Sequence, residues 1–182
     1  QGPLSQAAGH DINYLATAGF LSDVGSDRLT PALVSPPAAD TFGSMFALSS
    51  ILAALYAREQ SGEGCYLDLA LADAVAPILT LALSEIGGPT PRAARAEDFL
   101  SGGWACYGIY RCADGREVAL GAIEPKFWAA FCAAAGHPEW VAGQQETLPQ
   151  QALKEEVAAF FGAEPRETIL THFAQVDCCL SP

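Results

Sequence analysis

The segment Gly87-Gly88-Pro89-Thr90-Pro91 constrains the fold of this chain more than any other feature. Two glycines and two prolines within five residues cannot continue a helix or a central strand. Segments with helical spacing dominate before this break, whereas strand-like and helical segments alternate after it. We therefore predict an α/β chain with a mostly helical part over residues 1–84 and a small α+β part over residues 102–182. Residues 85–101, rich in proline, arginine and small residues, are predicted to be a mobile linker between them.

The helical part contains several recognisable segments. Residues 10–18 predict a short helix. Apolar residues of the segment 44–58 recur at helical spacing and alanines occupy its other faces, which is typical of a helix packed on several sides. Residues 65–71 alternate between apolar and polar side chains and predict a strand. Residues 73–83 are apolar enough for a buried helix.

The second part begins with the pattern of a β-hairpin. Residues 106–111 and 117–123 predict two strands, and the Asp114-Gly115 pair between them is a strong turn signal. Pro125 stands at a favoured first position of a helix, which Gly136 closes. We therefore expect a short antiparallel sheet with helices beside it. The remaining predicted elements are two helices and a short final strand, over residues 151–161, 166–173 and 175–180.

Charge and composition exclude several classes of function. The 182 residues include 9 Lys and Arg against 21 Asp and Glu, which gives a net charge of −12. Such a surface repels nucleic acid and anionic lipid, so we expect neither as a partner. The hydrophobic content of 51% is sufficient for a sizeable core. Polar or charged residues interrupt every apolar run before it reaches membrane-spanning length, so we expect no membrane segment.

The six cysteines indicate free thiols rather than a metal site. They form no C-x-x-C pair, and no histidine stands at zinc-ligand spacing, so we expect no bound metal. Their even number leaves disulfides open, but Cys132 lies in an apolar helical run and Cys65 begins an apolar strand, as buried free thiols do. The chain opens without the pattern of a secretory signal. We therefore predict a reducing, cytoplasmic location.

His10 stands at the start of the predicted helix over residues 10–18, a favourable place for proton transfer next to a carbonyl group. A helix start presents backbone N–H groups without intrahelical partners and the positive end of the helix dipole. Those groups can hold a negatively charged oxygen, while an imidazole exchanges protons near neutral pH. Taken alone, a Gly-His-Asp triplet favours a simpler interpretation, in which the histidine merely caps the backbone.

Four segments change that balance, and they occur in this order: Ala8–Tyr14, Asp40–Met45, Ile51–Leu55 and Gly121–Pro125. Together they resemble the α-methylacyl-CoA racemase branch of the family III CoA-transferases, the CaiB/BaiF type, over nearly the whole chain. The resemblance implies that residues 1–84 are the C-terminal part of a Rossmann-like, CoA-binding large domain. It also implies an acyl-CoA substrate, an interlocked homodimer, and no cofactor apart from the coenzyme A that belongs to the substrate.

The same resemblance implies roles for individual residues. His10 and Asp40 would be the two acid/base groups of a racemase, and in a CoA-transferase Asp40 would be the nucleophile. Glu124 would pair with the histidine, orienting its ring and raising its basicity, from another chain of the dimer. Tyr14 and Tyr107 would face the thioester and its CoA arm. The simpler alternatives are helix-capping carboxylates for the two acids and core aromatics for the two tyrosines.

Three functions therefore compete. The leading hypothesis is a racemase that moves the α-proton of 2-methylacyl-CoA thioesters between His10 and Asp40, with the enolate oxygen held by N–H groups that include that of Asp11. The second is a CoA-transferase that acts through an aspartyl-CoA thioester at Asp40. The third is a non-catalytic assembly fragment. No G-x-G-x-x-G or P-loop string occurs, and full-length relatives carry a nucleotide-binding part ahead of the His10 segment. We therefore expect a fragment that is inactive alone.

Overall fold

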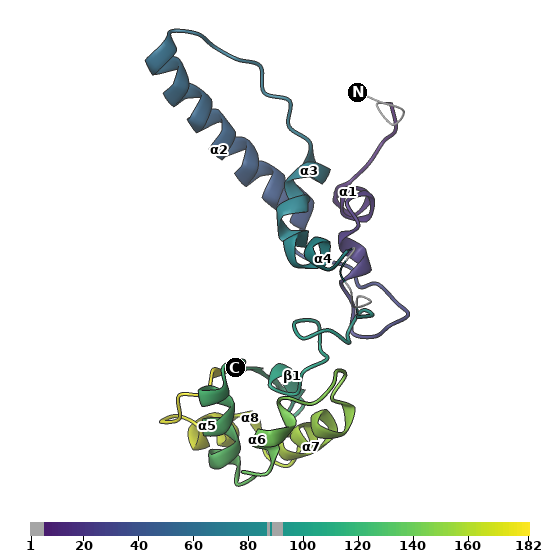
Figure 1. Cartoon of the computed structure of the whole chain (residues 1–182), viewed down its shortest axis with the longest axis vertical. Helices are drawn as coiled ribbons and strands as arrows, with labels where there is room; N and C mark the ends of the chain where they lie inside the picture. The colour runs from purple at the N-terminus through teal and green to yellow at the C-terminus, as the bar shows by residue number, and fades with distance from the viewer. Residues whose placement is uncertain (1–5, 87, 89–92) are drawn as a thin grey trace. The chain divides into compact units, whose positions relative to one another are not determined.

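The chain folds into two compact units, Gln1–Arg92 and Ala93–Pro182 (Figure 1). The computed structural model describes residues 6–86, 88 and 93–182. The first unit is helical and the second combines helices with a small antiparallel sheet, which confirms the predicted fold class.

The boundary between the units falls within the predicted linker, residues 85–101. Part of that linker, residues 87 and 89–92, lies outside the described residues, and so does most of the Gly87–Pro91 break. The mobility of the linker therefore stays a prediction.

The helices of the first unit are named here in chain order, with η for a 3₁₀ turn: α1 (Asp11–Thr17), η1 (Phe20–Ser22), α2 (Ala38–Ser61), α3 (Leu71–Val75), η2 (Ala76–Leu79) and α4 (Thr80–Glu85). α1 agrees with the helix predicted over residues 10–18. The helix predicted over residues 73–83 is divided into α3, η2 and α4. Pro77 explains the division, because it has no N–H to donate and the chain tightens into a 3₁₀ turn there.

α2 is longer at both ends than the helix predicted over residues 44–58. At its start, Pro37 occupies the N-cap position with extended backbone angles. The segment that includes Asp40 was expected to precede the helix, but it forms the first turn. The apolar periodicity begins only after this turn, so the sequence pattern placed the start of the helix too far along the chain.

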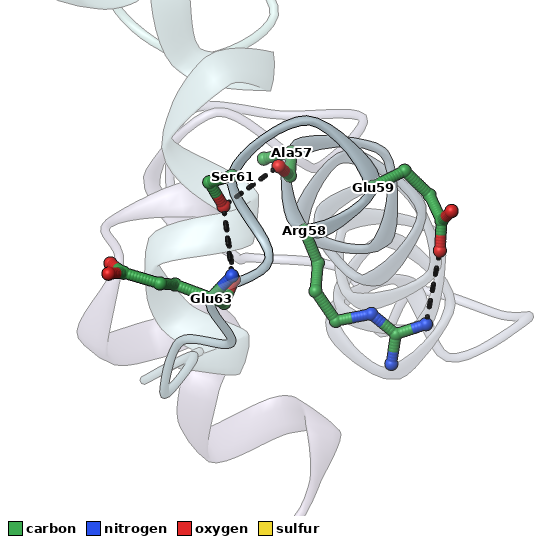
Figure 2. A network of polar contacts seen from close by, with 5 residues as sticks. All are labelled: Ala57, Arg58, Glu59, Ser61 and Glu63. Atoms are coloured by element: carbon green, nitrogen blue, oxygen red, sulfur yellow. Dashed lines mark hydrogen bonds and ion pairs between the residues drawn. The ribbon is translucent and has the colours of Figure 1, made fainter.

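The C-terminal end of α2 is closed by backbone geometry and one hydroxyl group (Figure 2). Gly62 adopts a left-handed conformation with φ of +75°, and its N–H donates to the carbonyl of Arg58 at 2.7 Å. The Ser61 hydroxyl donates to the Ala57 carbonyl at 3.0 Å and accepts from the N–H of Glu63 at 3.1 Å. The helix therefore ends with several of its last polar groups satisfied.

The first unit has a small core where α1, α2 and α3 meet. Leu15, Ala39 and Val75 are its fully buried members. Gly43 lets α2 and α3 approach closely, because a Cβ atom there would overlap the side chain of Leu71. This contact and the core both lie toward the N-terminal end of α2, whereas the rest of that helix extends beyond its neighbours (Figure 1).

Two predictions for the segment after α2 are wrong. Residues 65–71 do not form a strand, and Tyr66 within them is 88% exposed. A strand requires a partner for its backbone groups, and the described part of the first unit offers none. Cys65 was predicted to be a buried thiol, but it is exposed for the same reason.

α2 exposes many apolar side chains on several faces. The large ones that are exposed by a third or more are Phe42, Met45, Phe46, Leu48, Ile51, Leu52, Leu55 and Tyr56. By length and composition alone α2 is sufficient to cross a membrane, a test that core helices of soluble proteins also pass. The prediction that the chain has no membrane partner therefore stays untested.

The second unit contains the three-stranded sheet and four helices: β1 (Tyr107–Arg111), β2 (Glu117–Gly121), α5 (Pro125–Ala135), α6 (Trp140–Gly143), α7 (Gln151–Gly162), α8 (Arg166–His172) and β3 (Leu180–Ser181). The sheet order is β1-β2-β3, and both pairs are antiparallel. The predicted hairpin is confirmed, with Gly115 at φ of +78° in its turn. α6 was not predicted, because a single turn has no apolar period to detect. β3 starts later than residue 175, since residues 173–176 form a turn.

The core of the second unit is centred on Phe131 of α5, which is fully buried. Its ring lies near those of Trp128, Phe161 and Phe173, with centroids 5.4–5.6 Å away. Cys132, the next residue of α5, is also fully buried, as predicted. All six cysteines of the chain are free. The second unit is therefore held by a continuous apolar core rather than by disulfides.

Candidate functional site

His10 is the N-cap residue of α1, which confirms the predicted helix start. Its own N–H donates to the side-chain oxygen of Asn13 at 3.0 Å, and its carbonyl accepts from the Asn13 N–H at 2.9 Å. This reciprocal pair fixes the backbone at the start of the helix. The His10 side chain is exposed. Asn13 was not singled out from the sequence, although its position three residues after an N-cap is the signal that would have found it.

Asp11 connects the starts of two helices. Its carboxylate accepts a hydrogen bond from the backbone N–H of Asp40 at 3.0 Å, across 29 residues of chain. Asp40 belongs to the first turn of α2, where N–H groups have no intrahelical partner, so the Asp11 carboxylate supplies the missing acceptor. The structure therefore brings Asp11 and Asp40 together, with His10 adjacent in sequence to Asp11. The side chain of Asp40 itself is exposed.

Tyr14 contacts the backbone just before His10. Its hydroxyl donates to the carbonyl of Gly9 at 3.3 Å. A Cβ atom at position 9 would stand 3.2 Å from the tyrosine ring, so glycine allows this close approach. Tyr14 is half-buried and packs against the small core of the first unit. Its hydroxyl therefore supports the segment that leads into the His10 helix start.

Glu124 and Tyr107 belong to the second unit. Glu124 is the N-cap residue of α5, and its carbonyl accepts from Phe127 and Trp128 at 2.9 and 3.1 Å. Its carboxylate makes no capping hydrogen bond and is exposed, so the alternative is wrong in that the side chain does not cap the helix, and its interaction with the helix dipole stays a prediction. Tyr107 begins β1 opposite Gly121 of β2 and is half-buried. The expected pairing of Glu124 with His10 joins the two units and stays a prediction.

One further residue next to Glu124 was not found from the sequence. Gln144 is 4% exposed, and its side-chain amide donates to the carbonyl of Ile123 at 2.8 Å. A glutamine after an unpredicted single-turn helix carries no sequence signal of its own. Among the described residues, no group of three or more His, Cys, Asp and Glu side chains is placed to hold a metal ion.

Comparisons with known proteins agree with the resemblance in the sequence. The model of CoA-transferase family III matches residues 1–182. The α-methylacyl-CoA racemase of Mus musculus is 30% identical over 183 residues, which cover all of this chain and 48% of the racemase. The succinyl-CoA:mesaconate CoA-transferase of Haloarcula marismortui is 28% identical over 167 residues, which cover 88% of this chain and 41% of the transferase.

A solved structure shows the same fold. A CaiB/BaiF family protein from Brucella suis matches with a TM-score of 0.75 at 19% identity, covering 100% of this chain and 49% of that protein. The chain thus spans about half the length of the relatives it matches. With both the family model and the racemase alignment covering every residue, the chain belongs to CoA-transferase family III, an enzyme family with racemase and CoA-transferase members.

Proposed function

We propose that the enzyme containing this chain racemises 2-methylacyl-CoA thioesters by a two-base mechanism. His10 and Asp40 are the two bases. The observation that carries the proposal is the 3.0 Å hydrogen bond from the Asp40 N–H to the Asp11 carboxylate, which couples the start of α2 to the start of α1. The 30% identity to a racemase over the whole chain supports it.

The reaction is a transfer of one proton at one carbon. One base removes the α-proton of the thioester, and the C–H electron pair moves into an enolate. The other base then gives a proton to the opposite face of the same carbon, so either enantiomer can enter. Each base acts by standing close enough to the α-carbon to transfer its proton. General acid–base catalysis of this kind raises the rate about 10²–10⁴-fold. This scheme requires no metal or redox group.

The enolate oxygen is held by backbone N–H groups at the start of α1. The first residues of a helix have no intrahelical acceptor for their N–H groups, and Asp11 is the first residue of α1. One donor of this kind contributes roughly 3 kcal/mol to the transition state. The reciprocal pair between His10 and Asn13 supports this role by fixing the local backbone.

Glu124 orients the imidazole in this proposal. A carboxylate behind an imidazole fixes its tautomer and stabilises its protonated form. The carboxylate of Glu124 is exposed and makes no capping hydrogen bond, so it is available for such a contact. By analogy with the family, it would come from another chain of an interlocked homodimer.

The full-length enzyme with His10→Ala tests the proposal. We expect incorporation of deuterium from solvent to fall by at least about 10²-fold for the enantiomer whose proton His10 removes. Racemisation in both directions should fall with it. His137→Gln, which changes a half-buried histidine of the second unit, serves as the matched control and should retain activity. Undiminished exchange in the His10 variant would rule out the assignment.

CoA transfer through Asp40 is the second candidate, and the 28% identity to a succinyl-CoA:mesaconate CoA-transferase favours it. In that reaction the Asp40 carboxylate attacks the carbonyl of an acyl-CoA and releases the CoA thiolate, which leaves a mixed anhydride. The thiolate then attacks the Asp40 carbonyl of this anhydride, which gives an aspartyl-CoA thioester and releases the donor acid as its carboxylate. Incubation with an acyl-CoA followed by hydroxylamine and mass spectrometry distinguishes the two. A hydroxamate at Asp40 would favour transfer over racemisation.

A further inference from the structure

The side chain of Gln144 is buried next to the segment that ends in Glu124. It is 4% exposed, and its amide donates to the carbonyls of Ile123 at 2.8 Å and Ala122 at 3.3 Å. It also lies 3.7 Å from the sulfur of Cys106. A buried amide costs free energy unless it is hydrogen-bonded. Here its bonds go to the last two carbonyls before Glu124.

This contact restrains the direction in which Glu124 leaves the backbone. The Ile123 carbonyl and the Glu124 N–H share one planar peptide group. Holding that carbonyl fixes the peptide plane, and therefore the orientation of the Glu124 Cα–Cβ bond. The carbonyl of Glu124 is held separately, because it accepts hydrogen bonds from the N–H groups of Phe127 and Trp128 in the first turn of α5. The peptide planes on both sides of Glu124 are thus fixed, although its carboxylate is exposed.

Gln144 is itself held by a second buried glutamine. Gln150, also 4% exposed, donates to the backbone carbonyls of Gln144 at 3.1 Å and Gly143 at 2.9 Å. Its side-chain oxygen accepts from the N–H of Ala105 at 3.2 Å. A continuous set of buried hydrogen bonds therefore runs from Ala105 through the two glutamines to Ile123. Such a set has one low-energy arrangement, because breaking any member leaves a buried polar group unpaired.

We propose that Gln144 is a positioning residue of this enzyme, which sets the orientation of Glu124 by holding the carbonyls of Ala122 and Ile123. The proposal rests on the proposed function, in which Glu124 acts on His10. Gln144 acts through the backbone and contacts neither substrate nor the reacting atoms. Loss of its amide allows the Ile123–Glu124 peptide to rotate, and the carboxylate then meets the imidazole at a poorer angle.

Gln144→Met in the full-length enzyme is the direct test, because methionine keeps the length of the side chain and removes the donor. We expect kcat for racemisation to fall about 10- to 100-fold, in the range seen for small misplacements of catalytic groups, with little change in KM. The pH profile of kcat/KM should also change, since a misaligned carboxylate interacts more weakly with the imidazole. Tyr110→Phe, which removes the buried hydrogen bond from Tyr110 to the Ala105 carbonyl, is the matched control and should leave that pH profile unchanged.

A double-mutant cycle with Glu124→Gln separates positioning from a general loss of stability. In the Glu124→Gln background, Gln144→Met should lower kcat less than about 2-fold, because both changes act through the same carboxylate. An equal loss of kcat in both backgrounds would overturn the proposed role of Gln144 and would leave that of Glu124 standing. Wild-type racemisation in the Glu124→Gln single variant would overturn the proposed role of Glu124, and that of Gln144 with it.

Gln144→Asn covers the case in which the methionine variant does not fold. It retains the donor but shortens the side chain by one methylene, so kcat should lie between those of the wild type and the Glu124→Gln variant. The fluorescence of Trp104, Trp128 and Trp140, all of which belong to the second unit, reports whether that unit is folded. A folded asparagine variant with wild-type kcat and pH profile would overturn the proposal.

Discussion

The two units differ in how much of their apolar surface they bury. In the second unit, Trp128, Phe131 and Phe161 are fully buried in one core that joins helices and sheet. In the first unit the fully buried cluster consists of Leu15, Ala39 and Val75, and α2 exposes apolar side chains along most of its length. The second unit therefore has a core built from its own residues. In the first unit, α2 is covered by its neighbours only toward its N-terminal end.

The two units therefore differ in how far their own residues supply the core that each one needs. A domain is stabilised by a hydrophobic core formed from its own residues, and the second unit meets this condition. The sequence of α2, with alanines between larger apolar residues, is that of a helix surrounded on several sides. In the first unit the described residues cover only some of those sides.

Thiol labelling should show the largest contrast. Burial raises the pKa of the Cys132 thiol to about 12. Burial also raises the pKa of the Cys106 and Cys178 thiols. The thiolate is the reactive form, so we expect Cys132 to react with iodoacetamide orders of magnitude more slowly than the exposed Cys65 at about pH 8. Peptide mass spectrometry over time measures the rates. Similar rates at Cys65 and Cys132 in the native chain would contradict the buried core.

Truncation of the central phenylalanine should cause the largest loss of stability. We expect Phe131→Ala to lower the free energy of unfolding of the second unit by about 3–5 kcal/mol, through lost transfer free energy and a residual cavity. Urea unfolding followed by tryptophan fluorescence measures it, because all three tryptophans lie in this unit. Phe46→Ala in α2, where the side chain is partly exposed, should leave that transition unchanged. A shift would show that the two units unfold together.

A methyl group at position 43 should test the close approach of α2 to Leu71 of α3. Gly43→Ala gains helix propensity of about 1 kcal/mol but places Cβ against the Leu71 side chain, which costs roughly 1–3 kcal/mol. We expect a net loss of about 1 kcal/mol, seen as faster hydrogen exchange in the first turns of α2. In a Leu71→Ala background the same change should be neutral or stabilising. Destabilisation of equal size in both backgrounds would contradict the contact.

The smallest effect is expected at the surface of the second unit. Glu139 accepts a hydrogen bond from the His137 ring at 2.8 Å, and this contact lowers the pKa of its carboxyl group. A carboxylate with a lowered pKa in the folded state adds stability above its ordinary pKa, and this is lost as the pH falls through the folded value. We therefore expect Glu139→Gln to reduce the difference in unfolding free energy between about pH 6 and about pH 3. An unchanged difference would show that solvent screens the pair fully.

The sequence predicted the second unit well because its signals are local. The Asp114-Gly115 turn, Pro125 at the start of α5 and Gly136 at its end each act within a few residues. In the first unit two outcomes depend on distant groups. The start of α2 depends in part on a carboxylate 29 residues away, and the segment 65–71 requires a strand that the described residues do not provide.

The candidate site divides in the same way. The helix start at His10 follows from local spacing and was predicted, as was the position of Glu124 directly before α5. The contact of Asp11 with Asp40 could not be predicted, since no short-range pattern links residues so far apart. Gln144 was missed because a buried amide is recognised by its partners, and those lie on other elements.

The bond between Asp11 and Asp40 also makes the exposed loop between them tolerant of insertions. Because that bond fixes both ends of the intervening segment, its length has little influence on the geometry at the two helix starts. Doubling such a loop costs only about 0.6 kcal/mol in closure entropy, and residues 26–33 at its exposed side leave the small core untouched. A reporter peptide inserted there should therefore leave the starts of α1 and α2 in place.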